Sequence, residues 1–253
     1  MDAEAYARWV LEPPRPAELV RPRQSYFVCA TPRSGSWFLC GLLASTGVAG
    51  RPHEWFWRET RASLERRWSV RSADEYVKLV LAAGMTANGV FGAKVMFGSL
   101  PALTPFPRPR FVWMRRRDRV AQAASFAKAV QTGHWHHWDP PPHAAPSYRF
   151  DAIDTLLREV EALERGWAEW FARERVEPLE VVYEELAGDP EGQTRRVLDL
   201  LTVGQPTGDG IRSLTLRGHD DVNDEWSARY RADAAERPRE ALPGLRREHQ
   251  QDG

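Results

Sequence analysis

The segment Tyr26–Leu39 constrains the fold of this chain more than any other. An apolar run with β-forming residues ends at Thr31 and Pro32, a turn reading Arg-Ser-Gly-Ser follows, and apolar residues then resume at helical spacing. This order predicts a strand, a loop and a helix. The backbone N–H groups and dipole at such a helix start, together with the guanidinium of Arg33, form a binding site for a phosphate or sulfate.

Strands and helices alternate along the rest of the chain. The segments Val90–Phe97, Arg110–Met114 and Leu179–Tyr183 are predicted strands because they are short, largely apolar and bounded by polar residues. Predicted helices follow the opening loop and begin near Ser72, Asp118, Asp151 and Asp189, with a short one around Trp226 and Tyr230. The alternation indicates an α/β fold with a parallel sheet covered by helices.

Proline and charge patterns divide the chain into three parts. Residues 1–24 carry several prolines among charged residues and are predicted to be a leader. Residues 25–235 are predicted to form one domain, since 253 residues can bury one substantial core. Residues 236–253 are predicted to be a charged tail.

The charge balance of the chain indicates which partners it can bind, and its cysteine content indicates the cellular compartment. Lys plus Arg and Asp plus Glu number 35 each, so the chain has no general positive charge for nucleic acid or an anionic membrane. Cys29 and Cys40 form no disulfide framework and are expected to be buried thiols. No apolar stretch reaches the roughly 20 residues of a membrane-spanning helix, and the start lacks a signal pattern. We expect a cytoplasmic protein.

Three consecutive arginines follow the third predicted strand. Arg115–Arg117 stand at its end, and Ser125 lies on the next helix, where its hydroxyl can face the same anion. This pattern predicts a second anion site, and the alternative for one or two of the arginines is a solvated basic corner paired with Asp118. The first loop lacks the Gly-x-x-x-x-Gly-Lys-Ser/Thr order of triphosphate sites, and no predicted strand ends in an unencumbered Asp for magnesium. Two anion sites without metal ligands favour a donor with phosphates at both ends of a nucleoside.

Several motifs follow one another in order from about residue 25 to residue 232. They are Thr31–Ser36, Gly47–Phe56, Gly89–Met96, Arg116–Phe126 with Gln131–Thr132, Glu177–Pro178, and Asp224–Trp226 with Arg229–Tyr230. With these motifs the chain resembles the nucleotide-dependent sulfotransferase superfamily, and most closely the bacterial trehalose 2-sulfotransferase family. The resemblance implies a P-loop-like three-layer fold with a central parallel sheet flanked by helices, and a homodimer. It also implies 3′-phosphoadenosine 5′-phosphosulfate (PAPS) as donor.

The resemblance implies a set of donor-binding residues. They are Arg33, Ser34, Gly35, Ser36, Trp37, Arg116, Arg117, Ser125, Tyr183, Arg217 and Gly218. Either Arg116 or Arg117 would bind the 3′-phosphate with Ser125, because the family pattern leaves the register open by one position. Trp37 stands where the family usually has a second small hydroxyl residue. Tyr183 would be a side wall for the adenine, or alternatively a core residue.

The resemblance further implies that Glu54, Lys94 and Arg33 are catalytic. Many sulfotransferases place a histidine base two residues after the strand lysine, but here that position is Met96, which cannot accept a proton. The trehalose family has a glutamate in a Pro-x-Glu segment, which matches Glu54. The alternative for this glutamate is a salt bridge to Arg51 or Arg58.

The expected acceptor is a hydroxyl of a small molecule. Its implied contacts are His53, Glu54, Trp55, Gln131 and Trp135. A trehalose-like carbohydrate or sugar-bearing molecule is the family default, and an aromatic or other secondary-metabolite hydroxyl is the alternative. The histidines at 134, 136 and 137 with Asp139 lack paired helical spacing, so a surface loop that touches the acceptor is favoured over zinc, and no metal is expected. Other classes that stay open are a P-loop nucleotide kinase or NTPase and a non-catalytic nucleotide-binding module.

Overall fold

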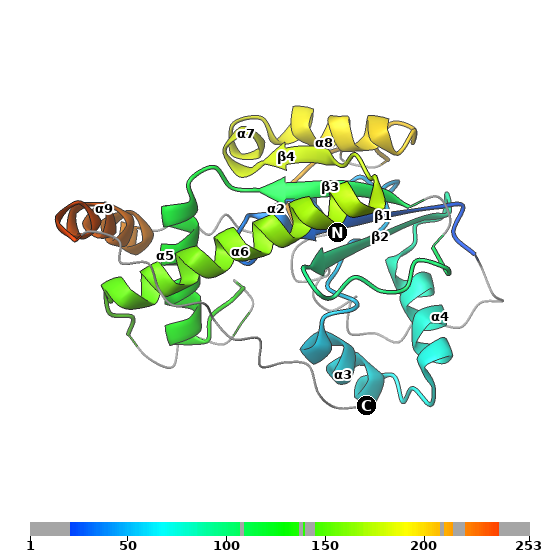
Figure 1. Ribbon diagram of the computed structural model, residues 1–253. Helices are drawn as coiled ribbons and strands as arrows, with labels where there is room; N and C mark the ends of the chain where they lie inside the picture. Colours follow the sequence, from blue (N-terminus) through cyan, green and yellow to red (C-terminus); the bar gives the residue numbers. More distant parts are fainter. Residues whose placement is uncertain are drawn as a thin grey trace.

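A parallel β-sheet forms the centre of the protein. The computed structural model describes residues 21–106, 109–136, 139, 145–207, 210–214 and 221–237. Four strands within these residues form one sheet, namely β1 (Gln24–Ala30), β2 (Val90–Met96), β3 (Arg110–Arg115) and β4 (Leu179–Val182). All pair in parallel, in the order β2-β1-β3-β4 (Figure 1). The predicted α/β class is confirmed.

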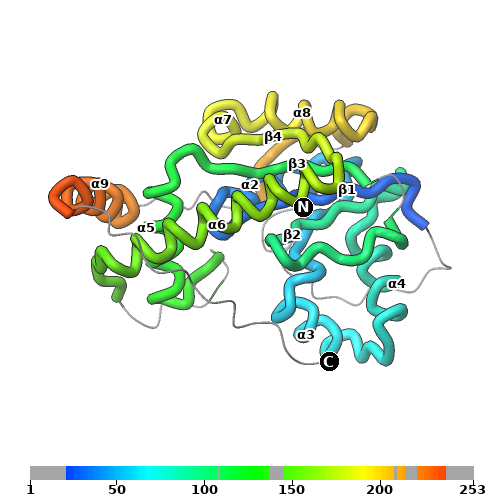
Figure 2. Tube along the Cα trace, viewed as in Figure 1, coloured from blue at the N-terminus to red at the C-terminus, as the bar shows by residue number. Residues whose placement is uncertain are grey.

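Helices pack on both faces of this sheet, as the tube in Figure 2 traces. They are α2 (Ser36–Ser45), α3 (Arg58–Arg67), α4 (Ala73–Gly84), α5 (Arg119–Thr132), α6 (Phe150–Glu174), α7 (Tyr183–Gly188), α8 (Pro190–Leu200) and α9 (Asp221–Glu236). None of the helices in the described part of the chain is both long enough and apolar enough to cross a membrane.

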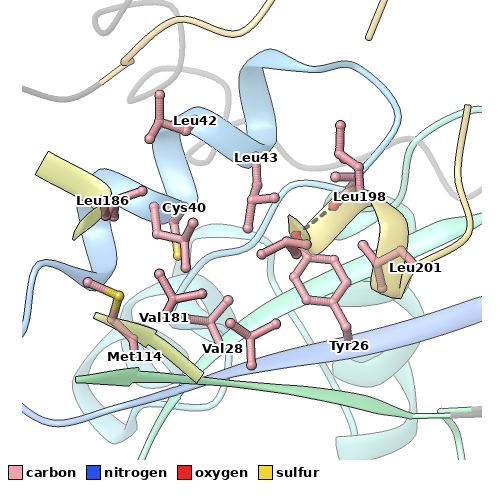
Figure 3. Packing of buried hydrophobic residues seen from close by; sticks show 14 of the residues in the cluster. Tyr26, Val28, Cys40, Leu42, Leu43, Met114, Val181, Leu186, Leu198 and Leu201 are labelled. Carbon is pink, nitrogen blue, oxygen red and sulfur yellow. Dashed lines mark hydrogen bonds between the residues drawn. The ribbon is translucent and has the colours of Figure 1, made fainter. Parts of the chain in front are cut away.

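Alternate residues of β1 point to opposite faces of the sheet. Tyr26 and Val28 pack with residues of α2 and α8 on one face, as Figure 3 shows. Phe27 and Cys29 pack on the other face with residues of α4 and α6. Because both faces are covered, β1 is apolar from Tyr26 to Ala30, which explains why its sequence shows no alternation.

Three predicted helix starts are confirmed by side-chain caps. Ser72, Asp118 and Asp189 each accept a hydrogen bond from a backbone N–H in the first turn of α4, α5 and α8, respectively. Pro190 occupies the first turn of α8, as predicted. The cap at Asp118 matters most for the site, because it begins α5 directly after the arginines of β3.

Helix α9 packs across α5 and α6. Trp226 and Tyr230 of α9 share an apolar cluster with the alanines of α5 and with residues of α6. The hydroxyl of Tyr230 donates to a carboxylate oxygen of Asp154 in α6 at 2.7 Å. Arg231 donates to both carboxylate oxygens of Asp118, each at 2.7 Å, so α9 holds the start of α5 in place.

Several local predictions differ from the structure. The strand expected to end at Phe97 ends at Met96, and Tyr183 opens α7 instead of closing β4. The short helix expected around Trp226 extends over 16 residues. Helix α3 has no counterpart among the predictions, because Leu64 is its one buried residue and leaves almost no apolar periodicity. The expected leader and tail lie almost wholly outside the described residues, so the domain boundaries stay predictions.

Candidate active site

The loop between β1 and α2 has a conformation suited to an anion. Arg33 has φ +60° and Gly35 has φ +88°, both in the left-handed region. A Cβ at Gly35 would also overlap the ring of Tyr183, so only glycine fits there. Ser34 is fully buried, and its hydroxyl has no hydrogen-bond partner within the described residues. A buried hydroxyl without a partner is uncommon and fits a ligand oxygen in this loop.

Arg33 connects this loop to two other segments. Its Nε donates to Oγ of Ser125 in α5 at 3.0 Å, and its Nη1 donates to the carbonyl oxygen of Trp135 at 2.6 Å. Burial, together with the nearby guanidinium of Arg116, lowers the pKa of Arg33. Cations held this close to each other favour an anion between them. The structure therefore brings Arg33, Ser125 and Arg116 to one site.

The arginines after β3 have different surroundings. Arg115 and Arg117 form ion pairs with glutamates of β4 and α7, at 3.2 Å and 2.8 Å. The guanidinium of Arg116 instead lies over the ring of Tyr183, 4.8 Å from its centroid. The Nε of Arg116 is buried and lacks a hydrogen-bond partner in the described part of the chain. This arrangement favours Arg116 over Arg117 as the anion ligand.

Two further residues of α5 face the same loop. Gln122 is fully buried, and its Nε2 donates to Oγ1 of Thr31 at 2.8 Å and to the carbonyl oxygen of Pro32 at 2.6 Å. Burial and the proximity of Arg33 lower the pKa of Lys128. Neither residue was among the predicted site residues. Their spacing of three from Ser125 places them on one face of α5, and that spacing is the signal that could have identified them.

Lys94 and Glu54 form a buried ion pair. The Nζ of Lys94 lies 2.7 Å from Oε1 of Glu54, and the two side chains are 2% and 12% exposed. Burial alone would raise the pKa of Glu54, but attraction to Lys94 outweighs it and holds the pKa below its ordinary value. Glu54 thus pairs with the strand lysine, while Arg58 pairs with Glu59.

The segment that carries Glu54 is fixed against β2 by backbone and side-chain hydrogen bonds. The backbone N–H of Lys94 donates to the carbonyl oxygen of His53 at 2.9 Å. The indole N–H of Trp55 donates to the carbonyl oxygen of Gly92 at 3.1 Å, and Trp55 is fully buried in the core. Trp55 was expected to contact the acceptor, but its side chain is fully buried and packs in the core next to the residue that carries the Glu54 carboxylate.

The indole of Trp37 covers the ammonium group of Lys94, with Nζ 4.4 Å from the ring centroid. The same ring meets His53 and His136 edge to face, at centroid distances of 4.9 Å and 5.1 Å. Burial lowers the pKa of His53 to about 3 and that of His136 to about 4, so both rings are neutral at neutral pH. Trp37 therefore provides an aromatic contact to the ammonium group of Lys94 where a hydroxyl was expected.

The segment after α5 is organised by Asp139. One carboxylate oxygen of Asp139 accepts hydrogen bonds from the backbone N–H groups of Trp135 and His136, both at 2.7 Å. The carbonyl oxygen of Trp135 accepts from Arg33, and its ring is 38% exposed. Among the described residues no group of three His, Cys, Asp or Glu side chains is arranged to hold a metal ion. The expected surface loop thus reaches the candidate site.

The remaining predicted site residues are placed as follows. Ser36 is buried at the start of α2. Gln131 accepts a hydrogen bond from the backbone N–H of Ser147 at 2.9 Å, and its own Nε2 is buried without a partner within the described residues. Arg217 and Gly218 lie outside the described residues, as does the histidine at position 137.

Comparison with known proteins identifies the family of this chain. Residues 25–106 and 104–233 match the Stf0 sulphotransferase family. The trehalose 2-sulfotransferase of Mycobacterium tuberculosis is 32% identical over 270 residues, covering 88% of this chain and 98% of that protein. The trehalose 2-sulfotransferase of Mycolicibacterium smegmatis is 31% identical over 265 residues, covering 87% and 97%.

A solved structure is more distantly similar. The crystal structure of a sulfotransferase from Alicyclobacillus acidocaldarius is 17% identical, with a TM-score of 0.48, and the alignment covers 84% of this chain and 93% of that one. The assignment rests on the family match and on the two relatives, which span most of the chain. This chain belongs to the Stf0 sulphotransferase family and is an enzyme of the sulfotransferase class.

Proposed function

We propose that this enzyme transfers the sulfuryl group of PAPS to a hydroxyl of a trehalose-like carbohydrate or a sugar-bearing small molecule, with Glu54 as the base. The observation that carries the proposal is the buried pair of Glu54 and Lys94, 2.7 Å apart, which contacts the donor loop through Trp37. The two relatives named for trehalose sulfation support a carbohydrate acceptor.

The residues around the first loop fit the two charged ends of PAPS. The unpartnered hydroxyl of Ser34 and the left-handed turn at Gly35 suit the 5′-phosphosulfate. Arg116 and Ser125 suit the 3′-phosphate, because both face Arg33 and the guanidinium of Arg116 has no carboxylate partner within the described residues. Tyr183 touches both regions and is placed beside the adenine. When bound, PAPS supplies an activated sulfuryl group.

Glu54 and Lys94 have complementary tasks in this proposal. Glu54 takes the proton from the acceptor hydroxyl while that oxygen forms its bond to sulfur, a role worth about 10²–10⁴ in rate. Lys94 and Arg33 stabilise the negative charge that collects on the phosphate oxygen released from sulfur. Transfer is in line and needs alignment of the two oxygens, which the packed ring of Trp37 and the braced loop provide.

The tight pairing with Lys94 lowers the pKa of Glu54 and makes it a weak base while no donor is bound. An anionic sulfuryl donor next to Lys94 shares the attraction of the ammonium group. The pKa of Glu54 then rises, because less of the field of Lys94 acts on the carboxylate. We infer that donor binding strengthens the base, so the acceptor is deprotonated efficiently only when PAPS is present.

Replacement of Glu54 by Gln tests the base. The variant should lose at least about 10²-fold in kcat with PAPS and trehalose, since Gln cannot accept the proton. Its affinity for the product 3′-phosphoadenosine 5′-phosphate (PAP), measured by calorimetry, should change little. The matched control is Glu59→Gln, because Glu59 is 60% exposed and pairs only with Arg58 among the residues described. Near-normal turnover by the Glu54→Gln variant would rule out Glu54 as the base.

An aromatic or other secondary-metabolite hydroxyl is the second candidate acceptor. The ring cluster of Trp37, His53 and His136 favours it, since neutral aromatic rings stack on planar substrates. A panel of trehalose, other disaccharides, glycosides and phenols, each offered with PAPS, separates the candidate acceptors by the mass gain of one sulfonate group.

A nucleotide kinase is tested by thermal stabilisation. Stabilisation by PAP without magnesium, and none by ATP, would reject that class.

A further inference from the structure

His136 lies at the Glu54–Lys94 pair although it comes from a separate segment. Its ring stands perpendicular to that of Trp37, at 88° and 5.1 Å between centroids. The ammonium group of Lys94 lies over the same indole at 4.4 Å. Lys94 and Glu54 both influence the pKa of His136, in agreement with a position of this histidine near the buried pair.

Asp139 sets the orientation of the His136 ring. A carboxylate oxygen of Asp139 lies 3.4 Å from Nδ1 of His136 and also accepts the backbone N–H of this histidine. A carboxylate beside Nδ1 favours the tautomer with the proton on that nitrogen. In this neutral ring Nε2 carries the lone pair, so it can accept a hydrogen bond from a hydroxyl group.

The position of this histidine is tied to the donor loop. Arg33 donates to the carbonyl oxygen of Trp135, the residue before His136, at 2.6 Å. The side chain of His136 is only 23% exposed and that of Asp139 only 20%, so the pair is held within the protein. A hydrogen-bond acceptor is thus held close to the proposed base Glu54.

We propose that His136 is an acceptor-binding residue whose Nε2 accepts a hydrogen bond from a second hydroxyl of the acceptor, with Asp139 as its positioning residue. The inference rests on the proposed function and refines its substrate class. A polyol with neighbouring hydroxyl groups satisfies both residues, since one hydroxyl gives its proton to Glu54 and the next donates to His136. A monohydric phenol lacks the second donor.

Two variants separate substrate binding from a structural role. The amide of Gln reaches about as far as Nε2, whereas the amide of Asn reaches about as far as Nδ1 and can meet only Asp139. His136→Asn should raise KM for trehalose about tenfold, as expected for one lost hydrogen bond, and His136→Gln should raise it less. The Kd of PAP should stay unchanged in both. Glu59→Gln, a change at an exposed residue outside the proposed site, is the control and should behave as the wild type.

The outcomes are distinguishable. An unchanged KM for trehalose in His136→Asn, or a better KM for Asn than for Gln, would overturn the inference, because contact with Asp139 alone would then explain the histidine. Weaker PAP binding by both variants would also overturn it, since the histidine would then support the donor loop. If the wild type sulfates no member of the acceptor panel, the proposed function fails and this inference falls with it.

Discussion

The Nη1 of Arg33 lies 2.6 Å from the carbonyl oxygen of Trp135, while its Nε lies 3.0 Å from the hydroxyl of Ser125. One guanidinium therefore joins the anion loop, helix α5 and the segment that carries His136. The proposed donor and acceptor residues come from different parts of the chain, and this contact fixes their relative positions.

Replacement of Arg33 by Lys should impair both halves of the site. A single ammonium group cannot bridge Ser125 and the Trp135 carbonyl at once, because it lacks the planar fork of guanidinium. We expect PAP to bind about tenfold more weakly and KM for trehalose to rise. Calorimetry and steady-state kinetics measure the two effects. If PAP affinity falls while KM for trehalose stays unchanged, Arg33 does not couple the segments.

Replacement of Lys94 by Met should destabilise the protein. The variant leaves the buried carboxylate of Glu54 without its partner, which costs about 3–5 kcal/mol in comparable buried pairs. The double variant Lys94→Met, Glu54→Gln should recover part of that loss, since no buried charge remains. Urea unfolding of the wild type, both single variants and the double variant gives the coupling energy. Additive effects in this cycle would show that the pair does not interact.

Replacement of Gly35 by Ala should abolish donor binding. The Cβ would meet the ring of Tyr183 and would also sit at φ +88°, so the loop or the ring must move. Gly98→Ala is the matched control, because Gly98 has φ +87° but no atom within 4 Å of the added Cβ. Both variants should lose about 1 kcal/mol to backbone strain, and only Gly35→Ala should lose PAP affinity. Equal PAP affinities in the two variants would contradict the proposed donor loop.

The stability of the protein should fall in mildly acidic solution. Burial lowers the pKa of His53 to about 3, well below its value of about 6.5 in the unfolded chain. The unfolded state therefore binds more protons between these pKa values, and the free energy of unfolding decreases as the pH falls through this range. The free energy of unfolding of the His53→Asn variant should decrease less steeply as the pH falls, by up to about 1.4 kcal/mol per pH unit. Urea unfolding at about pH 8 and about pH 5 compares the two. If the wild type and the variant lose the same stability between these pH values, His53 is not the cause of the pH dependence.

The fold was predictable because local signals agree. Apolar strands alternate with helices whose starts are marked by Ser72, Asp118 and Asp189, and each of these caps is present. Helix α3 escaped prediction since it buries little beyond Leu64. Its amphipathic pattern is too weak to detect from spacing.

The residues of the candidate site could be predicted from the sequence better than the contacts between them. Lys94 and Glu54 were both expected to be catalytic, yet their pairing depends on how the segment before α3 lies against β2. The contact of Trp37 with Lys94 and the approach of His136 join residues far apart in the chain. No periodicity relates such residues, because loops rather than repeating elements determine where they meet.

The hydrogen bonds from Arg231 to Asp118 affect the order in which the enzyme acquires its functional structure during synthesis. The two residues are 113 positions apart, so the ribosome releases the anion loop and α5 long before α9 exists. A domain generally folds as a unit, so its last contacts form only after its C-terminal residues have been synthesised. The start of α5, with Ser125 about two turns beyond it, gains its last support only when α9 docks. Binding of PAP should therefore be acquired late on the ribosome, after the sheet itself has formed.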